Sequence, residues 1–397
     1  MGVTDSKHKF RGGLKKSIMY FDNAATTQVY PFVLDAMAKM HLSNYGNPSA
    51  SHLSGRMART AVENARETIA DLLAVKSDEI YFTSGATESI NTFLRGFSAH
   101  NCDKRRNKII ITNIDHKAVS ATCDDLKKLG YQINTVDVLP DTGLVNLQQL
   151  YGVIDTKTLL VCIIMANNEI GVIQPVDKIA EMAHRHGALF FSDTTQIAGK
   201  YEVHPKELGI DAMCISAHKF GGPKGVGLLY ISGELECNPI MTGGPQEHGI
   251  RAGTLNTPGI VGLASAMKFN LSDHGQELYA KVEEKRDWIQ DKLSQYIPGL
   301  IVNALGAERV GNILSVSVAG VNNGKLTQYL DEREIVVNTG SACNAGKRSN
   351  VLAAIGLTLV EEQGTIRISL SPLNTWDECD LLAREIITYI KTNQNTT

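Results

Sequence analysis

The chain has 397 residues, of which 43% are hydrophobic and 20% are charged, and its formal net charge at pH 7 is −3. This composition is that of an ordinary globular protein, long enough for one large domain and a smaller one. A nearly neutral chain has no overall field that draws it to nucleic acid, and no apolar run approaches the roughly 20 residues of a membrane helix. We therefore expect no direct nucleic-acid partner and no membrane partner.

Apolar, strand-like runs alternate with helical patterns through the first two thirds of the chain. Several of these runs are apolar on both faces, as strands of a parallel sheet covered by helices are. Helical patterns lie between them at 54–74, 87–99, 117–129 and 176–186. The predicted strands are 79–85, 108–114, 131–138, 158–166, 188–193, 212–217 and 227–232. This alternation predicts an α/β domain with a mostly parallel seven-stranded sheet.

The pattern changes from about residue 275. A long helical pattern over 275–296 is followed by shorter strands in NILSVSVAG and GTIRISLS and by a final helix over 376–391. These elements predict a smaller α+β domain. We predict a large domain over 29–274 and a small domain formed by 1–28 and 275–397.

The cysteines and the N-terminal segment indicate the compartment. The seven cysteines, at 102, 123, 162, 214, 237, 343 and 379, are odd in number and include no C-x-x-C motif. This favours reduced thiols over a disulfide framework or a zinc site. The N-terminal segment is polar and basic and lacks the apolar region of a secretory signal. We therefore expect a cytoplasmic protein without a metal site.

Polar residues follow the predicted strands at their carboxyl ends, where open α/β sheets bind ligands. The stretch TSGATES begins a helix with small residues and free backbone amides, which suits an anion. The residues that follow the later strands are His116, Asn167, Asp193, Gln196, Ser216, His218 and Lys219. Each alone could be a helix cap or a core residue. Their convergence on one sheet edge predicts a binding site.

Lys219 lies in the glycine-rich segment CISAHKFGGPKGVGLLYIS. This segment is not a P-loop, because its second lysine, Lys224, lies between proline and glycine and no Ser or Thr follows it. It is not a dinucleotide-binding loop, because strand-like residues follow the glycines. An anion site, a lysine and a buried carboxylate together suit pyridoxal 5'-phosphate (PLP). The lysine would attach to the cofactor aldehyde, and the carboxylate would keep the pyridine nitrogen protonated.

Ten spaced blocks run in order from residue 20 to about 370. They are YFDNAATT, YGNPSASH, TSGATES, DHKAV, ANNEIG, SDTTQ, SAHKFGGPKGVG, GGPQEHGIRAGT, VNTGSACNAG and TIRISLS. In these blocks the chain resembles the cysteine desulfurases of the class V aminotransferase family. The resemblance implies a fold-type I PLP-dependent transferase, with PLP as its cofactor and L-cysteine as its substrate.

The resemblance also implies a role for individual residues at the cofactor ring. Lys219 would be the Schiff-base lysine, and Asp193 would pair with the pyridine nitrogen. Gln196 would donate a hydrogen bond to the ring hydroxyl, while His116 would stack on the ring and move protons. The glycines after Lys219 would let the backbone turn closely beside the cofactor.

Further roles concern the phosphate and the substrate. The residues implied to hold the phosphate are Ala86 (through its amide), Thr87, Ser216 and His218. Thr254 would reach the phosphate of a partner subunit, which implies a homodimer. Asn167 would lie beside the substrate, and Arg367 would bind its carboxylate through a planar fork. Lys224 has no counterpart among these roles, and we assign it to the loop or the surface.

Cys343 lies in VNTGSACNAGKRSN between Gly340 and Gly346. Small neighbours leave its sulfur accessible, and Lys347 and Arg348 would favour the thiolate if they fold toward it. The resemblance implies that Cys343 attacks the sulfur of L-cysteine. L-alanine and a Cys343 persulfide would form, and the persulfide would pass its sulfur to an acceptor protein.

Two alternatives remain open on the sequence. One is a selenocysteine lyase or another PLP-dependent lyase or aminotransferase, although a transaminase has no need of Cys343. The other is an inactive sulfur-carrier or scaffold subunit. The joint presence of Lys219, Asp193, His116, Arg367 and Cys343 speaks against a subunit without activity.

Three departures from the family pattern bear on the acceptor. The block GGPQEHG carries Pro245 and His248 where relatives often have glycine and arginine, the segment after Cys343 is short, and the chain ends 30 residues after Arg367. These departures favour a specialised acceptor over general iron–sulfur assembly. The candidates are a partner in tRNA thiolation or in DNA phosphorothioation, and the neutral charge implies that this partner contacts the nucleic acid.

Overall fold

The structure is a computed structural model that describes residues 18–394, apart from 102, 104, 234 and 341–347. Its large sheet has the strand order β2-β8-β7-β6-β5-β3-β4. The strands are β2 (Ile80–Thr83), β3 (Lys108–Thr112), β4 (Gln132–Val136), β5 (Thr158–Ile164), β6 (Leu189–Asp193), β7 (Ala212–Ser216) and β8 (Gly227–Ile231). β8 runs antiparallel to β2 and β7, and all other neighbours pair in parallel. The predicted mostly parallel seven-stranded sheet is confirmed.

Strand β5 shows why the sheet is covered on both faces. All seven of its residues are buried. Leu160 and Cys162 belong to one hydrophobic core, whereas Val161 and Ile163 belong to another. Because successive strand residues point to opposite faces, this continuous apolar run requires helices on each side.

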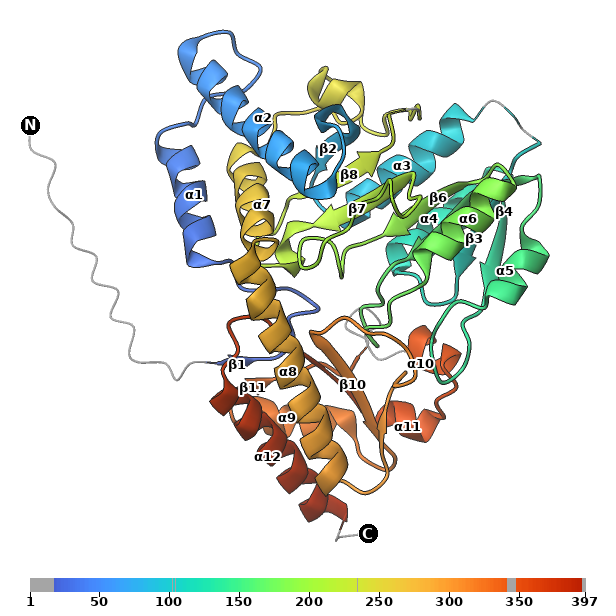
Figure 1. Ribbon diagram of the computed structural model, residues 1–397, viewed down its shortest axis with the longest axis vertical. Helices are drawn as coiled ribbons and strands as arrows, with labels where there is room; N and C mark the ends of the chain where they lie inside the picture. Colours follow the sequence, from blue (N-terminus) through green and yellow to red (C-terminus); the bar gives the residue numbers. More distant parts are fainter. Residues whose placement is uncertain (1–17, 102, 104, 234, 341–347, 395–397) are drawn as a thin grey trace, which may run out of the picture.

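Helices cover both faces of the large sheet, as Figure 1 shows. The helices α3 (Ala86–His100) and α4 (Lys117–Lys128) pack on one face. The opposite face is covered by α2 (Leu53–Leu73), α5 (Leu147–Val153), α6 (Val176–Arg185) and α7 (Thr257–Asn270), and α1 (Pro31–Leu42) packs against α7. Helix α4 illustrates the pattern, since Val119, Cys123 and Leu126 form one buried stripe.

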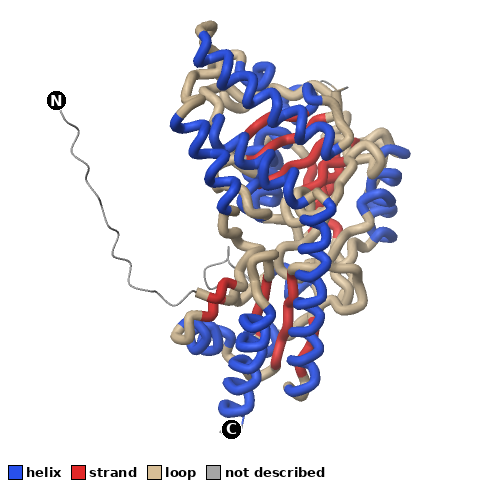
Figure 2. The backbone as a smooth tube through the Cα atoms, turned by 60° about the vertical axis from the view of Figure 1, so that its left-hand side comes forward, coloured by secondary structure: helices blue, strands red, loops and turns tan. Residues whose placement is uncertain are grey.

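The remaining elements form a second layered unit, which Figure 2 shows as a separate group of strands. Strands β9 (Leu300–Val302), β10 (Ile313–Val318) and β12 (Thr365–Ser369) form an antiparallel sheet, and β1 (Met19–Tyr20) pairs in parallel with β11 (Ile335–Val336). The helices of this unit are α8 (Asp273–Tyr296), α9 (Asn323–Asp331), α10 (Asn350–Ala354), α11 (Leu359–Gln363) and α12 (Trp376–Gln394). The fold class, α/β with a smaller α+β unit, is confirmed.

The second unit has its own hydrophobic core. Phe21 near the N-terminus packs with Val282 and Ile289 of α8, with strand residues such as Leu314, and with Ile386 of α12. The N-terminal segment, which precedes the large sheet in the sequence, therefore shares a hydrophobic core with residues that follow the large sheet. The exact domain limits remain a prediction.

No helix in the described part of the chain has both the length and the apolar character that membrane crossing requires.

Candidate active site

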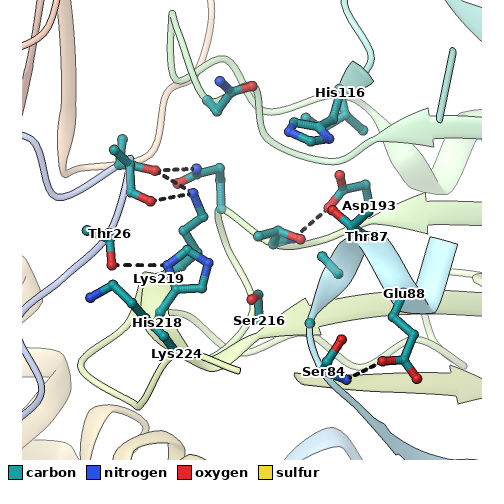
Figure 3. A pocket seen from close by; sticks show the side chains of 18 of the residues that line it. Thr26, Ser84, Thr87, Glu88, His116, Asp193, Ser216, His218, Lys219 and Lys224 are labelled. Carbon is teal, nitrogen blue, oxygen red and sulfur yellow. Dashed lines mark hydrogen bonds between the residues drawn. The ribbon is translucent and has the colours of Figure 1, made fainter. Parts of the chain in front are cut away.

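A cavity of about 570 Å³ opens where the parallel strands of the large sheet end. This volume is typical of sites that bind small molecules and cofactors. Figure 3 shows side chains from several strand ends converging on it. The lining residues are Ala24, Ala25, Thr26, Ser84, Gly85, Ala86, Thr87, Glu88, His116, Ile164, Asn168, Asp193, Thr195, Gln196, Ser216, His218, Lys219, Lys224, Gly225 and Arg367. Most residues that the sequence singled out are therefore brought together.

One wall of the cavity is the start of α3. Its N-terminal cap is Gly85, which makes no side-chain cap and has φ of +150°. A Cβ atom there would lie 3.3 Å from Ser216 Oγ and would narrow the cavity. Glycine thus leaves the helix N-terminus and the Ser216 hydroxyl open to the same space. Backbone amides and the helix dipole favour an anion at this position.

Glu88 in the first turn of α3 closes this wall. Its carboxylate accepts hydrogen bonds from the Ser84 amide, at 2.8 Å, and from Arg251 Nε, at 2.7 Å. Burial opposes ionisation, but the hydrogen bonds from Arg251 and Ser84 outweigh it and lower the pKa of Glu88. The ion pair offsets the negative charge of Glu88, so the anion site keeps its positive potential.

Lys219 lies at the end of a short 3-10 turn, η2 (Ala217–Lys219), directly after β7. Its Nζ donates to the carbonyls of Ala24 and Ala25, at 2.8 and 2.9 Å. Of the glycines that follow, Gly225 lines the cavity, whereas Gly221 has a different role. A Cβ atom at Gly221, whose φ is +85°, would lie 2.2 Å from the ring of Tyr30. This glycine serves close packing of the protein against itself, not an approach to a ligand.

His218, beside Lys219, is held neutral. Its Nδ1 lies 3.1 Å from Thr26 Oγ1. Burial lowers the pKa of His218 to about 4, and the positive charges of Lys219 and Lys224 contribute. Lys224 lines the cavity with its ammonium group near this histidine, so assigning it to the loop or surface was incomplete. Thr26 and Lys224 are site residues that the sequence analysis did not identify.

Asp193 ends β6 and lies almost completely buried in the cavity wall. The Thr195 amide and the Cys214 thiol both donate to its Oδ1, at 3.0 and 3.4 Å. Within the described residues, Oδ2 is therefore the oxygen left for a ligand. Burial, together with the negative charge of Asp193, raises the pKa of Cys214 well above its ordinary value, so this thiol stays a donor.

His116 is the N-terminal cap of α4. Its Nδ1 accepts a hydrogen bond from the Ala118 amide at 3.1 Å, which assigns the proton of the neutral imidazole to Nε2. The cap holds the ring in the cavity wall, and Figure 3 shows it on the same side of the cavity as Asp193.

Arg367 on β12 reaches the cavity from the second unit of the fold. Its side chain is 1% exposed, with Nη2 donating to Asp22 Oδ1 at 2.7 Å and Nη1 donating to the Asn168 carbonyl at 2.8 Å. No described group accepts from its Nε. The planar fork is therefore fixed in orientation at the cavity wall. Asp22 is a further residue that the sequence analysis missed.

The expected substrate neighbour Asn167 does not line the cavity. It is fully buried. Its side-chain amide donates to the carbonyl of Ile114 and accepts from the backbone amides of Glu169 and Ile170 in the turn after β5. This side chain stabilises the loop after β5. Its place beside the substrate stays a prediction, and the next residue of the ANNEIG block, Asn168, lies on the cavity wall.

Two predicted residues lie elsewhere. Thr254 is exposed, between the turn η3 (Gln246–Gly249) and α7, and does not line this cavity. Its expected contact with a partner subunit stays a prediction. Cys343 lies outside the described residues.

The donors and acceptors of the cavity fit PLP. A helix N-terminus and a hydroxyl, with the lysines close by, suit the phosphate, the free Asp193 oxygen suits a protonated ring nitrogen, and the amine of Lys219 suits an aldehyde. Fold and site together define a fold-type I PLP-dependent enzyme.

Comparisons with known proteins identify the family. The model of the family described as Aminotransferase class-V matches residues 19–382. The cysteine desulfurase IscS of Dictyoglomus turgidum is 37% identical over 365 residues, which are 91% of this chain and 92% of that protein. The chain therefore belongs to the class V aminotransferase family, whose members depend on PLP, and within it to the cysteine desulfurases.

Solved structures agree with this assignment. A NifS-like protein superimposes with a TM-score of 0.88 at 37% identity, covering 95% of this chain and 100% of that one. The structure titled SspA in complex with cysteine superimposes with a TM-score of 0.79 at 33% identity, covering 90% and 100%.

Proposed function

We propose that this chain converts L-cysteine to L-alanine and passes the sulfur, through Cys343, to an acceptor protein. The observation that carries the proposal is the presence of Lys219, Asp193 and Arg367 in one cavity. A lysine and a carboxylate suit the cofactor, and the arginine fork suits the carboxylate of an amino acid. A relative solved with cysteine bound supports cysteine as the substrate.

The cofactor-binding roles follow the chemistry of the wall. Lys219 would attach to the cofactor aldehyde, the free oxygen of Asp193 would pair with the pyridine nitrogen, and Gln196 would donate to a polar ring substituent. The residues that would hold the phosphate are Ala86, Thr87, Ser216 and His218, and Lys224 lines the same cavity. Thr254 contacts the phosphate of a second copy of the chain, so the proposed assembly is a homodimer.

When bound, PLP supplies a ring that accepts electrons from the substrate α-carbon. Arg367, oriented by Asp22 and by the Asn168 carbonyl, holds the substrate carboxylate. The amine of Lys219 would take the proton from the substrate α-carbon. His116, whose Nε2 carries the proton in the neutral ring, is placed to donate it to the reacting substrate.

The sulfur-transfer step forms a bond between the sulfur of Cys343 and the substrate sulfur. The thiolate of Cys343 attacks that sulfur, the substrate bond between Cβ and sulfur breaks, and the electron pair of that bond stays with the carbon, which is protonated to give alanine. The persulfide on Cys343 then gives its outer sulfur to an acceptor thiol. The acceptor serves iron–sulfur assembly, as the IscS names of relatives suggest for those proteins, or the thiolation of tRNA or DNA.

The test is incubation of the protein with L-cysteine and a reductant, with sulfide and alanine both measured. We expect equal amounts of the two products from the wild type, and their loss in Cys343→Ala. The control variant is Cys379→Ala, which removes a buried thiol from the second core and should retain activity. Alanine production that survives in Cys343→Ala would contradict the persulfide route and favour a lyase. No alanine from a yellow wild-type protein would contradict the substrate assignment.

A further inference from the structure

Lys200 is a buried lysine to which the proposed mechanism gives no task. Only 1% of its surface is exposed. Its Nζ makes two long contacts, each of 3.5 Å, to Gln196 Oε1 and to Asn312 Oδ1. Among the residues that the structure describes, no carboxylate forms an ion pair with it. A buried ammonium group is therefore stabilised by two amide oxygens and by no opposite charge.

This arrangement is unfavourable for folding. A charge taken out of water without a counter-ion costs far more than two long hydrogen bonds return. Burial lowers the pKa of Lys200 to about 7, and the positive charge of Lys219 acts in the same direction. An apolar side chain of similar size would fill the position at less cost. Stability of the core therefore does not explain why a lysine occupies this position, and a role in the site could explain it.

The contacts of Lys200 lead directly to the cavity. Gln196, which lines the cavity, uses its amide in two directions: Oε1 accepts from Lys200, and Nε2 donates to the Ala24 carbonyl at 3.0 Å. The same Ala24 carbonyl accepts from Lys219 at 2.8 Å. Lys200, Gln196, Ala24 and Lys219 thus form a continuous chain of polar contacts.

Lys200 also decides which way the Gln196 amide points. With the amide reversed, its NH₂ group would face the Lys200 ammonium and its carbonyl would face the Ala24 carbonyl. The contact between the two carbonyls would be repulsive, and so would the contact between the NH₂ group and the protonated amine, because each would join two donors or two acceptors. The lysine therefore keeps the oxygen of Gln196 in the interior and its N–H groups toward Ala24 and the cavity.

We propose that Lys200 is a positioning residue for the cofactor, which holds the Gln196 amide so that its N–H donates to an oxygen of bound PLP. The inference deepens the proposed function and rests on PLP occupying the cavity. It does not depend on the amino acid that is used as substrate or on the route of the sulfur.

The experiment measures PLP binding to protein freed of cofactor, by the visible absorption that develops as PLP is added. The variants are Lys200→Met, Gln196→Ala, the double variant, and Lys178→Met as the control. Lys178 is an exposed lysine on α6, so its replacement should change nothing. The thermal midpoint of each cofactor-free protein is recorded beside the dissociation constant.

We expect Lys200→Met to weaken PLP binding roughly tenfold. The variant loses the hydrogen bond from the lysine to Gln196 Oε1, and this bond sets the orientation of the Gln196 amide. The thermal midpoint of the cofactor-free variant should not fall, because an unpaired buried charge is removed. In the Gln196→Ala background, Lys200→Met should cause no further loss of affinity, since the group through which it acts is gone.

Three results would overturn the inference. They are unchanged PLP affinity in Lys200→Met, the same loss of affinity with and without Gln196, and a loss of affinity that only parallels a fall in thermal midpoint. A Lys200→Gln variant keeps an N–H donor and should recover part of the affinity if Lys200→Met fails to fold. A wild-type protein that binds no PLP would refute the proposed function instead, so the two failures are distinguishable.

Discussion

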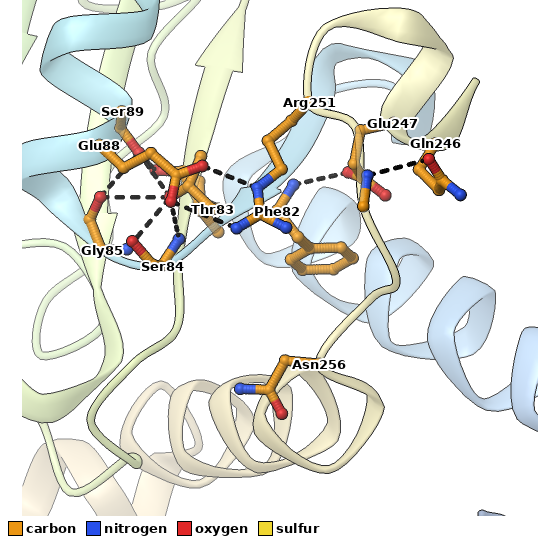
Figure 4. Close-up of polar contacts among 12 residues, drawn as sticks. Phe82, Thr83, Ser84, Gly85, Glu88, Ser89, Gln246, Glu247, Arg251 and Asn256 are labelled. Atoms are coloured by element: carbon orange, nitrogen blue, oxygen red, sulfur yellow. Dashed lines mark hydrogen bonds and ion pairs between the residues drawn. The ribbon is translucent and has the colours of Figure 1, made fainter. Parts of the chain in front are cut away.

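A buried ion pair fixes the turn that leads from the second half of the large sheet toward α7, and it provides a quantitative test. Glu247 in η3 has φ of +48°, in the left-handed region. Its carboxylate accepts from both terminal nitrogens of Arg66, at 2.9 and 2.7 Å, and from the Phe82 amide at 2.6 Å. The two charged side chains are 4% and 1% exposed. Figure 4 shows the contact between the Phe82 amide of β2 and the Glu247 carboxylate of the turn.

The cost of breaking this pair follows from its burial. Replacing Arg66 leaves the Glu247 carboxylate uncompensated in the interior, and replacing Glu247 leaves the Arg66 guanidinium with only the half-exposed Glu63 as counter-ion. We expect each change to cost about 3–5 kcal/mol. Replacing both by apolar side chains removes both charges and leaves mainly the Phe82 amide and the Ile80 carbonyl without their partners, at about 1–3 kcal/mol each. We therefore expect Arg66→Met and Glu247→Met each to cost about 4 kcal/mol, and the double variant to cost much less than their sum.

Thermal unfolding of the cofactor-free protein measures this coupling. With an unfolding entropy of about 2.1 cal/mol/K per residue, 397 residues give about 0.8 kcal/mol/K, so 4 kcal/mol lowers the midpoint by about 5 °C. The double variant should melt above the value that additive single effects predict. Additivity within about 0.5 kcal/mol would refute the reasoning, because it would mean that the two charges do not depend on each other.

Three more predictions concern the cavity and its surroundings. Arg367→Lys should raise KM for L-cysteine about tenfold in an alanine assay, because a point charge cannot replace the fork that Asp22 orients; an unchanged KM would remove Arg367 from substrate binding. Lys219→Ala should purify without visible absorption, whereas Lys224→Ala should stay yellow and bind PLP a few-fold more weakly; equal behaviour of both would contradict the assignment of the covalent lysine. Burial raises the pKa of Glu169 to about 7 from 4.5. The folded state therefore keeps a proton that the unfolded state loses, and the free energy of unfolding should fall by up to about 3 kcal/mol between pH 4.5 and 7. Glu169→Gln should flatten that part of the stability profile, and an unaltered profile would show that this carboxyl is not responsible.

Much of the large sheet could be read from local patterns. In the run from Thr158 to Ile164, every residue except the threonine is apolar, so both faces of the strand are apolar. A buried central strand was the one arrangement that satisfied this pattern. The direction of β8 was not predicted. The link between β7 and β8 contains no α-helix, and a short connection of this kind returns the chain antiparallel instead of crossing over to a parallel strand.

The site residues that lie at the ends of strands could be predicted from the sequence. Asp193, Ser216 and Lys219 each come directly after an apolar run, and the carboxyl ends of parallel strands meet at one edge. The sequence did not single out Asn168 as a cavity residue. Asn167 and Asn168 are the same residue type at adjacent positions, and only the turn after β5 decides which one faces the cavity.

By itself, then, the sequence determined the order of elements, the edge of the sheet that carries the site and the chemical groups found there, because all of these depend on residues close together in the chain. Contacts between distant segments were decided by the tertiary structure alone. Asp22 pairs with Arg367 across 345 positions, and Lys200 reaches Asn312 across 112. Such pairs depend on how the second unit packs against the large sheet, which no local spacing of residues encodes.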